Sequence, residues 1–128
     1  MKAASGGLTS VSLTARRDLE QVALFRSGGF QLSSVLHIVL KELEQYDIYF
    51  LETPLPIDDL DGYAYLADHS PIRIAAGEWQ NTRFEVIDLM DRGHVDVVQP
   101  DVGRVGGLTE ALRVAELAGT RGKTVAPH

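Results

Sequence analysis

The sequence contains no cysteine, no block of basic residues and no long apolar run. The absence of cysteine excludes disulfides, thiolate metal sites and cysteine nucleophiles, and it is typical of a cytoplasmic protein. The formal net charge is −6, from 12 basic and 18 acidic residues, so nucleic acid is not expected as a partner. No stretch approaches the ~20 apolar residues of a membrane span. These absences predict a cytoplasmic globular chain that binds neither nucleic acid nor membranes.

Four ionisable residues follow short apolar segments that read as β-strands, with helical patterns between them. Because one strand–helix–strand unit spans ~30 residues, their spacing of about 25 residues predicts consecutive parallel strands. The expected fold class is therefore α/β, an incomplete (β/α) TIM-type barrel of about four parallel strand–helix units. The strands are expected at 48–51, 72–76, 95–98 and 124–126, and the ionisable residues that follow them are Glu52, Glu78, Asp101 and His128.

Residues at the carboxyl ends of barrel strands carry the chemistry in enzymes of this architecture. The four residues therefore converge on one rim of the predicted sheet. Three carboxylates and an imidazole in that arrangement suggest a divalent metal beside a His–Asp acid/base pair.

Helix signals lie between the predicted strands. Acidic residues at 58–61 suit the first turn of a helix, where the helix dipole favours negative charge. Thr82 and Glu85 fit a capping box, and Thr109 begins a further helical pattern that stops at Gly119. Residues 1–30 are expected to be an unassigned, poorly ordered segment with a short helix at 16–25. A helix cap is expected at Ser33 or Ser34. Residues 31–128 are expected to form the partial barrel domain.

Four segments together resemble the barrel domain of the enolase superfamily, in the mandelate racemase-like branch that includes many acid-sugar dehydratases. The resemblance covers about residues 38–128, and the segments appear in the expected order and at the expected intervals. They are 49–55 (YFLETPL), 76–79 (AGEW), 99–109 (QPDVGRVGGLT) and 127–128 (PH).

The resemblance implies that Glu52 and Glu78 hold Mg²⁺, and that Asp101 and His128 form a dyad with the imidazole as base. It implies abstraction of the proton α to a carboxylate, an enediolate intermediate and loss of water to give a 2-keto-3-deoxy acid. The expected partner is a small-molecule carboxylate, a sugar acid. Oxygen ligands suit Mg²⁺, and histidine titrates near working pH.

The chain also departs from the family pattern. The family's first metal ligand, an Asp, would lie near position 26, where this chain has Arg26 and no acidic residue between Gln21 and Val39. The Lys-X-Lys base would lie at or beyond Met1, and the capping domain is absent. We therefore expect a fragment with weak or no activity alone.

Other interpretations stay open at this point. Glu52 could be a structural ion-pair partner, Asp101 could cap a turn, and Trp79 could line a pocket or simply pack. His37, His69 and His94 are expected at surfaces or boundaries, and the glycines at 103, 106 and 107 in a loop. The chain could instead belong to a racemase or epimerase, or act without catalysis through self-association or a partner. A half-barrel leaves sheet edges unpaired, which predicts a homo-oligomer.

Overall fold

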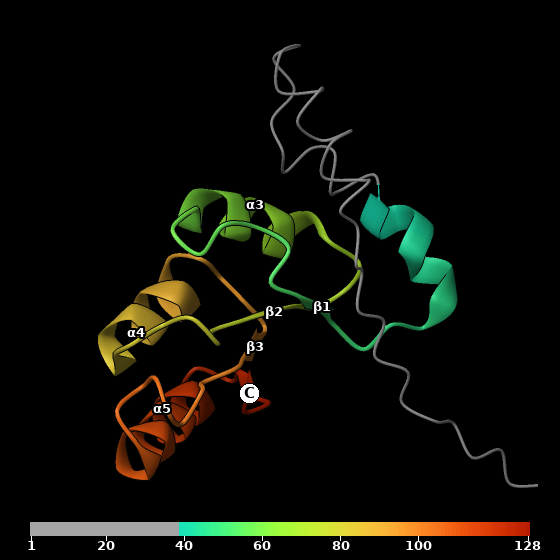
Figure 1. The fold of residues 1–128 in the computed structure, drawn as a ribbon. Helices are drawn as coiled ribbons and strands as arrows, with labels where there is room; N and C mark the ends of the chain where they lie inside the picture. The colour runs from blue at the N-terminus through green and yellow to red at the C-terminus, as the bar shows by residue number, and fades with distance from the viewer. Residues whose placement is uncertain (1–38) are drawn as a thin grey trace, which may run out of the picture.

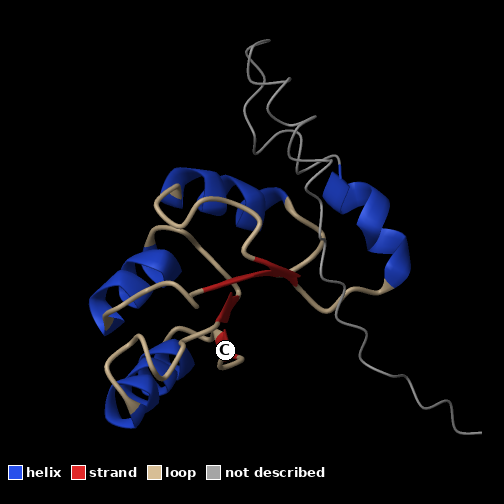
Figure 2. Ribbon diagram, viewed as in Figure 1, coloured by secondary structure: helices blue, strands red, loops and turns tan. Residues whose placement is uncertain are grey.

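Short apolar segments separated by capped helices form a four-stranded parallel sheet. The structure, a computed structural model, describes residues 39–128. The strands lie in the order β1-β2-β3-β4, so each neighbours the next along the chain (Figure 2). Their bounds are β1 (Leu51–Glu52), β2 (Ile74–Ala76), β3 (Val97–Val98) and β4 (Thr124–Val125). All three pairings are parallel, which confirms the predicted α/β class.

Helices connect the strands. In Figure 1, α3, α4 and α5 follow one another along the same side of the sheet. Residues 39–43 are also helical and lead into a 3₁₀ turn before β1. The named helices are η2 (Glu44–Tyr46), α3 (Leu60–His69), α4 (Arg83–Asp91) and α5 (Leu108–Thr120).

Side-chain caps fix where these helices begin. The predicted capping box is present at α4, where Thr82 accepts a hydrogen bond from the Glu85 backbone and Glu85 accepts one from the Thr82 backbone. Asp59 caps α3 by accepting from the backbone N–H of Gly62 at 2.9 Å. Helix α5 begins one residue before the predicted Thr109, because Gly107 takes the cap position without a side-chain bond.

The core lies between the sheet and these helices. β2 is buried along its whole length, as expected for a parallel strand covered on both faces. Tyr63 of α3 is fully buried, and its hydroxyl donates to the carbonyl of Leu55 at 2.9 Å. Burial raises the pKa of this phenol to about 12, although the Leu55 bond opposes the shift. Tyr63 therefore ties the segment after β1 to the core.

One side chain joins segments that lie on both sides of β2. The Arg73 guanidinium donates to the Tyr49 hydroxyl at 3.0 Å and to the Thr124 hydroxyl at 2.5 Å. Tyr49 precedes β1 and Thr124 belongs to β4, so a residue just before β2 reaches toward both outer strands. These two bonds connect segments at the end of the sheet where the strands begin.

Several predictions fall outside the described residues. These are the unassigned segment 1–30, the helix at 16–25, the cap at Ser33 or Ser34, and the placement of His37. The domain boundary near residue 30 likewise stays a prediction.

Candidate functional site

The four predicted residues lie at the carboxyl ends of the four parallel strands. Glu52 is the last residue of β1, and Glu78, Asp101 and His128 follow β2, β3 and β4 by two or three residues. Backbone hydrogen bonds continue past the strands: Gln99 N–H donates to Ala76 at 2.9 Å, and His128 N–H to Pro100 at 3.3 Å. The segments that carry the side chains therefore stay side by side at one rim.

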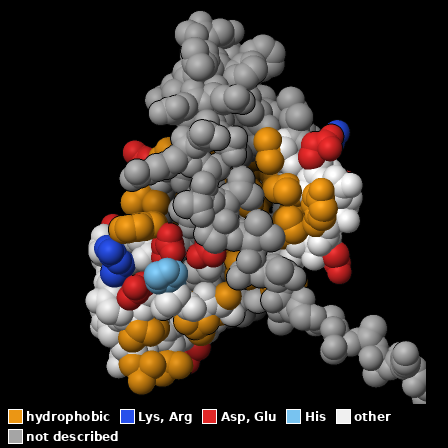
Figure 3. Space-filling view, turned by 45° about the vertical axis from the view of Figure 1, so that its right-hand side comes forward, with side chains coloured by type: hydrophobic (Ala, Val, Ile, Leu, Met, Phe, Trp, Pro, Cys, Tyr) orange, Lys and Arg blue, Asp and Glu red, His pale blue; other side chains and the backbone are white. Residues whose placement is uncertain are grey.

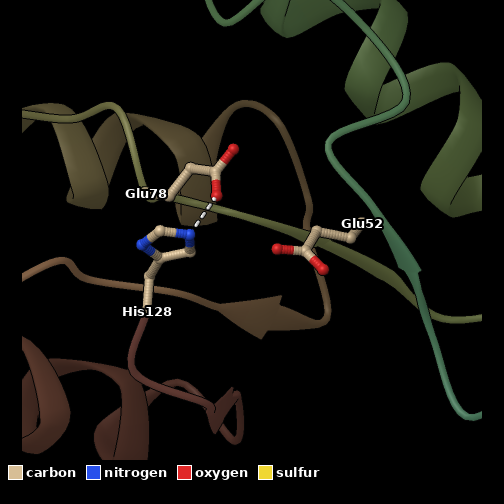
Figure 4. Close-up of side chains that lie close together, drawn as sticks. All are labelled: Glu52, Glu78 and His128. Atoms are coloured by element: carbon tan, nitrogen blue, oxygen red, sulfur yellow. Dashed lines mark ion pairs between the residues drawn. The ribbon is translucent and has the colours of Figure 1, made fainter. Parts of the chain in front are cut away.

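Three of these residues form a cluster that could hold a metal ion. One potential ligand atom from each of Glu52, Glu78 and His128 lies within 4.8 Å of the others. In Figure 4 these side chains point toward a shared space, and His128 Nε2 lies 3.0 Å from Glu78 Oε2. The space-filling view of Figure 3 likewise shows a histidine set among acidic side chains.

Asp101 lies on the other side of the imidazole. His128 Nδ1 is 3.5 Å from Asp101 Oδ2, while Asp101 Oδ1 accepts backbone N–H bonds from Gly103 at 2.7 Å and Arg104 at 3.1 Å. One carboxylate oxygen thus holds the turn and the other faces the histidine. Asp101 can therefore cap the turn and also serve as the partner of His128. Desolvation raises the pKa of Asp101, but these backbone bonds and His128 lower it to a net value below its usual range.

The carboxylate of Glu78 is held on both oxygens. Oε1 accepts a 2.6 Å hydrogen bond from Trp79 Nε1 and lies 3.5 Å from the Thr53 hydroxyl. Oε2 faces His128, and only 16% of the Glu78 side chain is exposed, against 51% for His128. Both oxygens of Glu78 are therefore held in place, whereas the imidazole contacts Glu78 and Asp101 but is about half exposed.

The sequence did not predict the surroundings of Trp79. Its indole lies under the guanidinium of Arg104, 4.5 Å from the ring centroid. Sequence reasoning left Trp79 undecided between pocket lining and packing, and it gave Arg104 no role. No local signal marks this contact, because it joins loops that follow two different strands.

Two backbone positions shape the strand ends. Gly77 has φ 133°, and a Cβ there would meet the backbone nitrogen of Gln99 at 2.9 Å. The absence of a side chain therefore lets the segment before Glu78 approach the end of β3. Thr53, directly after Glu52, has φ 43°, a conformation that β-branched residues rarely adopt.

The remaining candidates lie away from the cluster. His69 ends α3 and stacks on Tyr65, and His94 lies 2.9 Å from Asp68. Of the acidic residues at 58–61, Asp59 caps α3, Asp61 lies in its first turn and Asp58 precedes the cap. Within residues 39–128, no further group of three or more acidic, histidine or cysteine side chains could hold a metal ion.

A cavity of about 240 Å³ adjoins the site without including the cluster. It lies between the loops after β1 and β2 and the first turns of α4, and Trp79 forms part of its wall. None of Glu52, Glu78 and His128 lines it.

The sequence of this chain matches a known family. The sequence profile of the enolase C-terminal domain-like family matches residues 27–128. This chain belongs to that family. The enolase superfamily resemblance predicted from the sequence motifs is thus confirmed, and with it the relation to the mandelate racemase branch.

Two groups of relatives of this enolase-type chain are dehydratases and mandelate racemase-like proteins. The chain is 37% identical to D-galactonate dehydratase of Ralstonia pickettii (strain 12J) over 91 residues, 71% of this chain and 24% of that enzyme. Its structure is similar to L-talarate dehydratase from Polaromonas sp. JS666, complexed with Mg and L-glucarate. The TM-score is 0.71 and the identity 33%, over 75% of this chain and 27% of that one.

A mandelate racemase/muconate lactonizing enzyme from Jannaschia sp. CCS1 is equally similar. Its TM-score is 0.71 at 34% identity, over 75% of this chain and 25% of that one. This enolase-type chain therefore spans about a quarter of the length of these relatives. In the part that the structure describes, no helix has the length and apolar character to cross a bilayer.

Proposed function

We propose that this chain is the part of a Mg²⁺-dependent acid-sugar dehydratase that supplies two metal ligands and the His–Asp base. Glu52 and Glu78 would hold the metal, and His128 with Asp101 would move the proton. The observation that carries the proposal is the convergence of Glu52, Glu78 and His128 within 4.8 Å, with Asp101 on the far side of the imidazole.

The donor set fits Mg²⁺ in part. Carboxylate oxygens are the ligands that Mg²⁺ prefers, and it usually keeps several water molecules. Two carboxylates meet in this cluster, and no third one joins them within residues 39–128. Glu78 Oε2 now faces His128, so binding of a cation would compete with that contact. When bound, Mg²⁺ would neutralise charge that develops on the substrate carboxylate.

His128 would act as the base through Nε2 when Glu78 Oε2, which faces this nitrogen at 3.0 Å, is engaged as a metal ligand instead. The nitrogen would take the proton from the carbon next to the substrate carboxylate, and the electron pair of that C–H bond would pass onto the carboxylate. Asp101 faces Nδ1, so it would keep that nitrogen protonated and stabilise the imidazolium that forms. The 51% exposure of His128 leaves the ring open to a substrate.

The same imidazolium would complete the elimination. It would return its proton to the hydroxyl group on the next carbon, which leaves as water when the C–O bond breaks. The resulting enol tautomerises to a 2-keto-3-deoxy acid. The similarity to D-galactonate and L-talarate dehydratases supports a sugar acid as the substrate.

Proton exchange in D₂O tests this proposal, because it needs only the base and a bound substrate. The chain would be incubated with D-galactonate or L-glucarate and Mg²⁺, and NMR would follow the C2 proton and any keto acid. We expect slow loss of the C2–H signal with keto acid formation, abolished in His128→Asn. His94→Asn, which lies outside the cluster, should behave as wild type. Exchange that persists in His128→Asn would contradict the proposal.

A racemase or epimerase is the second candidate, supported by the similarity to the mandelate racemase/muconate lactonizing enzyme. It shares the first proton removal, so Glu52, Glu78 and His128 would keep their roles. The same NMR experiment separates the two. Inverted sugar acid without keto acid would favour the racemase, and keto acid would favour the dehydratase.

A further inference from the structure

Arg104 and Trp79 connect the loop that carries Glu78 to the loop that carries Asp101. Arg104 binds Asp101 through its backbone N–H, and its guanidinium stacks on the Trp79 indole 4.5 Å away. Trp79 in turn donates its indole N–H to Glu78 Oε1 at 2.6 Å. The two loops follow different strands, so this chain of contacts fixes one relative to the other.

These contacts close a ring. Glu78 Oε2 lies 3.0 Å from His128 Nε2, and His128 Nδ1 lies 3.5 Å from Asp101 Oδ2. Starting from Asp101, the ring passes through His128, Glu78 and Trp79 and returns through Arg104. Every side chain of the proposed dyad is therefore linked to Glu78 by two routes, one through the imidazole and one through the aromatic–cation stack.

We propose that Arg104 is a positioning residue that acts through Trp79 to hold the Glu78 carboxylate in one orientation. Trp79 takes Oε1, which leaves Oε2 as the oxygen for which His128 and a cation would compete. A planar guanidinium stacks well on an aromatic face, whereas an ammonium does not reproduce that geometry. Arg104 also secures Asp101, so it couples the orientation of Glu78 to that of the dyad. We call the contact of Arg104 with Trp79, together with the Trp79 bond to Glu78, the clamp on Glu78. The statement about the cation rests on the proposed function, whereas the clamp does not.

The indole N–H of Trp79 is a direct reporter, because Trp79 is the sole tryptophan of the chain. Its single indole peak in a ¹H–¹⁵N NMR spectrum reports the hydrogen bond to Glu78 without any metal or substrate. We expect Arg104→Met and Glu78→Gln each to move this peak upfield and to speed its exchange with water. Arg104→Lys should lie between Arg104→Met and wild type.

Arg83→Met is the matched control. Arg83 also stacks on an aromatic ring, that of Phe84 at 4.6 Å, but on α4 and without contact to Glu78. Its substitution should leave the Trp79 indole peak in place. An indole peak that Arg104→Met leaves unchanged would overturn the proposal, because Arg104 would then be a surface contact only.

Mg²⁺ titration by calorimetry adds the second readout. If the clamp presents Glu78 to the metal, Arg104→Met should weaken the Mg²⁺ Kd by about three- to fivefold, the scale of one exposed cation–π contact. In a Trp79→Leu background the same substitution should have no further effect, because Arg104 acts through Trp79. If the losses of Mg²⁺ affinity from the two substitutions add in the double variant, Arg104 does not act through Trp79.

The two arms separate the failure of the clamp from the failure of the proposed function. A wild-type chain that binds no Mg²⁺ but shows the expected indole shifts would keep the clamp and remove the metal site. If Arg104→Met binds Mg²⁺ as well as wild type and leaves the indole peak unmoved, the metal site stays and the clamp is overturned.

Discussion

Thr53 shows that the rim is held under backbone strain next to a proposed metal ligand. Its φ of 43° lies in the left-handed region, which costs on the order of 1–3 kcal/mol for such a residue. The Thr53 N–H continues the parallel ladder by donating to Ala75 at 2.8 Å, and its hydroxyl lies near Glu78. The ladder therefore holds the strained residue, and Glu52 before it stays aligned with the end of β2.

Gly77→Ala should destabilise the fold. At φ 133° a Cβ would be strained, and it would meet the backbone nitrogen of Gln99 at 2.9 Å. We expect a loss of at least about 1 kcal/mol in the free energy of unfolding, measured by urea denaturation. Gly119→Ala is the control, because it lies inside α5 with nothing within 4 Å of its Cβ. That change should stabilise by up to about 1 kcal/mol, and equal effects of the two would contradict this account of Gly77.

For single residues, the sequence predicted which side chains meet at the rim of the sheet, but not which neighbouring side chains hold them in place. Glu52, Glu78, Asp101 and His128 follow from the strand–helix interval and the motif resemblance. The Trp79 bond to Glu78 depends on a side-chain rotamer, and the Arg104 stack depends on the loop path after β3. Neither leaves a periodic pattern along the chain, so neither could be predicted from the sequence.

Helices α4 and α5 are joined by one carboxylate. Glu110 of α5 accepts a hydrogen bond from Arg83 of α4 at 2.6 Å and pairs with Arg113 on its own helix. The Arg83 bond lowers the pKa of Glu110 below its usual value, although desolvation opposes this, and Arg113 lowers it further. Because the folded pKa is depressed, the pair stabilises the fold above the unfolded pKa of about 4.3 and the stabilisation is lost as pH falls through the folded pKa.

Glu110→Gln should therefore lower the urea midpoint at pH 7, and the difference from wild type should shrink toward pH 3. The side chains are partly exposed, so the effect should be small and reduced by salt. Glu116→Gln on the same helix is the control, because Glu116 makes no ion pair within residues 39–128. A difference between Glu110→Gln and wild type that is constant from pH 7 to pH 3 would count against this pairing.

The boundaries of the strands show what a run of apolar residues can and cannot predict. The sequence predicted strands at 48–51 and 72–76, whereas β1 is Leu51–Glu52 and β2 is Ile74–Ala76. Ile48 packs against the core and Ile72 is buried, yet both lie outside the ladder. An apolar residue indicates burial, but a strand also requires hydrogen bonds between backbone groups. The predicted strands therefore began before the first hydrogen-bonded pair. The capping box at Thr82 was predictable because its spacing is local.

For the whole molecule, sheet edges that have no partner strand among residues 39–128 predict self-association. Within the described residues β1 pairs only with β2, and β4 pairs only with β3. Unpaired parallel edges offer backbone groups to another chain. We expect a dimer or larger species in small-angle scattering and sedimentation across a dilution series. A monodisperse monomer at all concentrations would be incompatible with this expectation.

The measurement that bears most directly on the central claim is the Mg²⁺ dependence of thermal unfolding. Ligand that binds only the folded state raises the apparent stability by mass action. We predict a saturable rise in Tm for wild type that Glu52→Gln/Glu78→Gln loses. Asp58→Asn/Asp61→Asn, which removes the same charge at the start of α3, should keep the rise. A cooperative transition with no Mg²⁺ shift, or an equal shift in all three proteins, would contradict a metal site at Glu52 and Glu78.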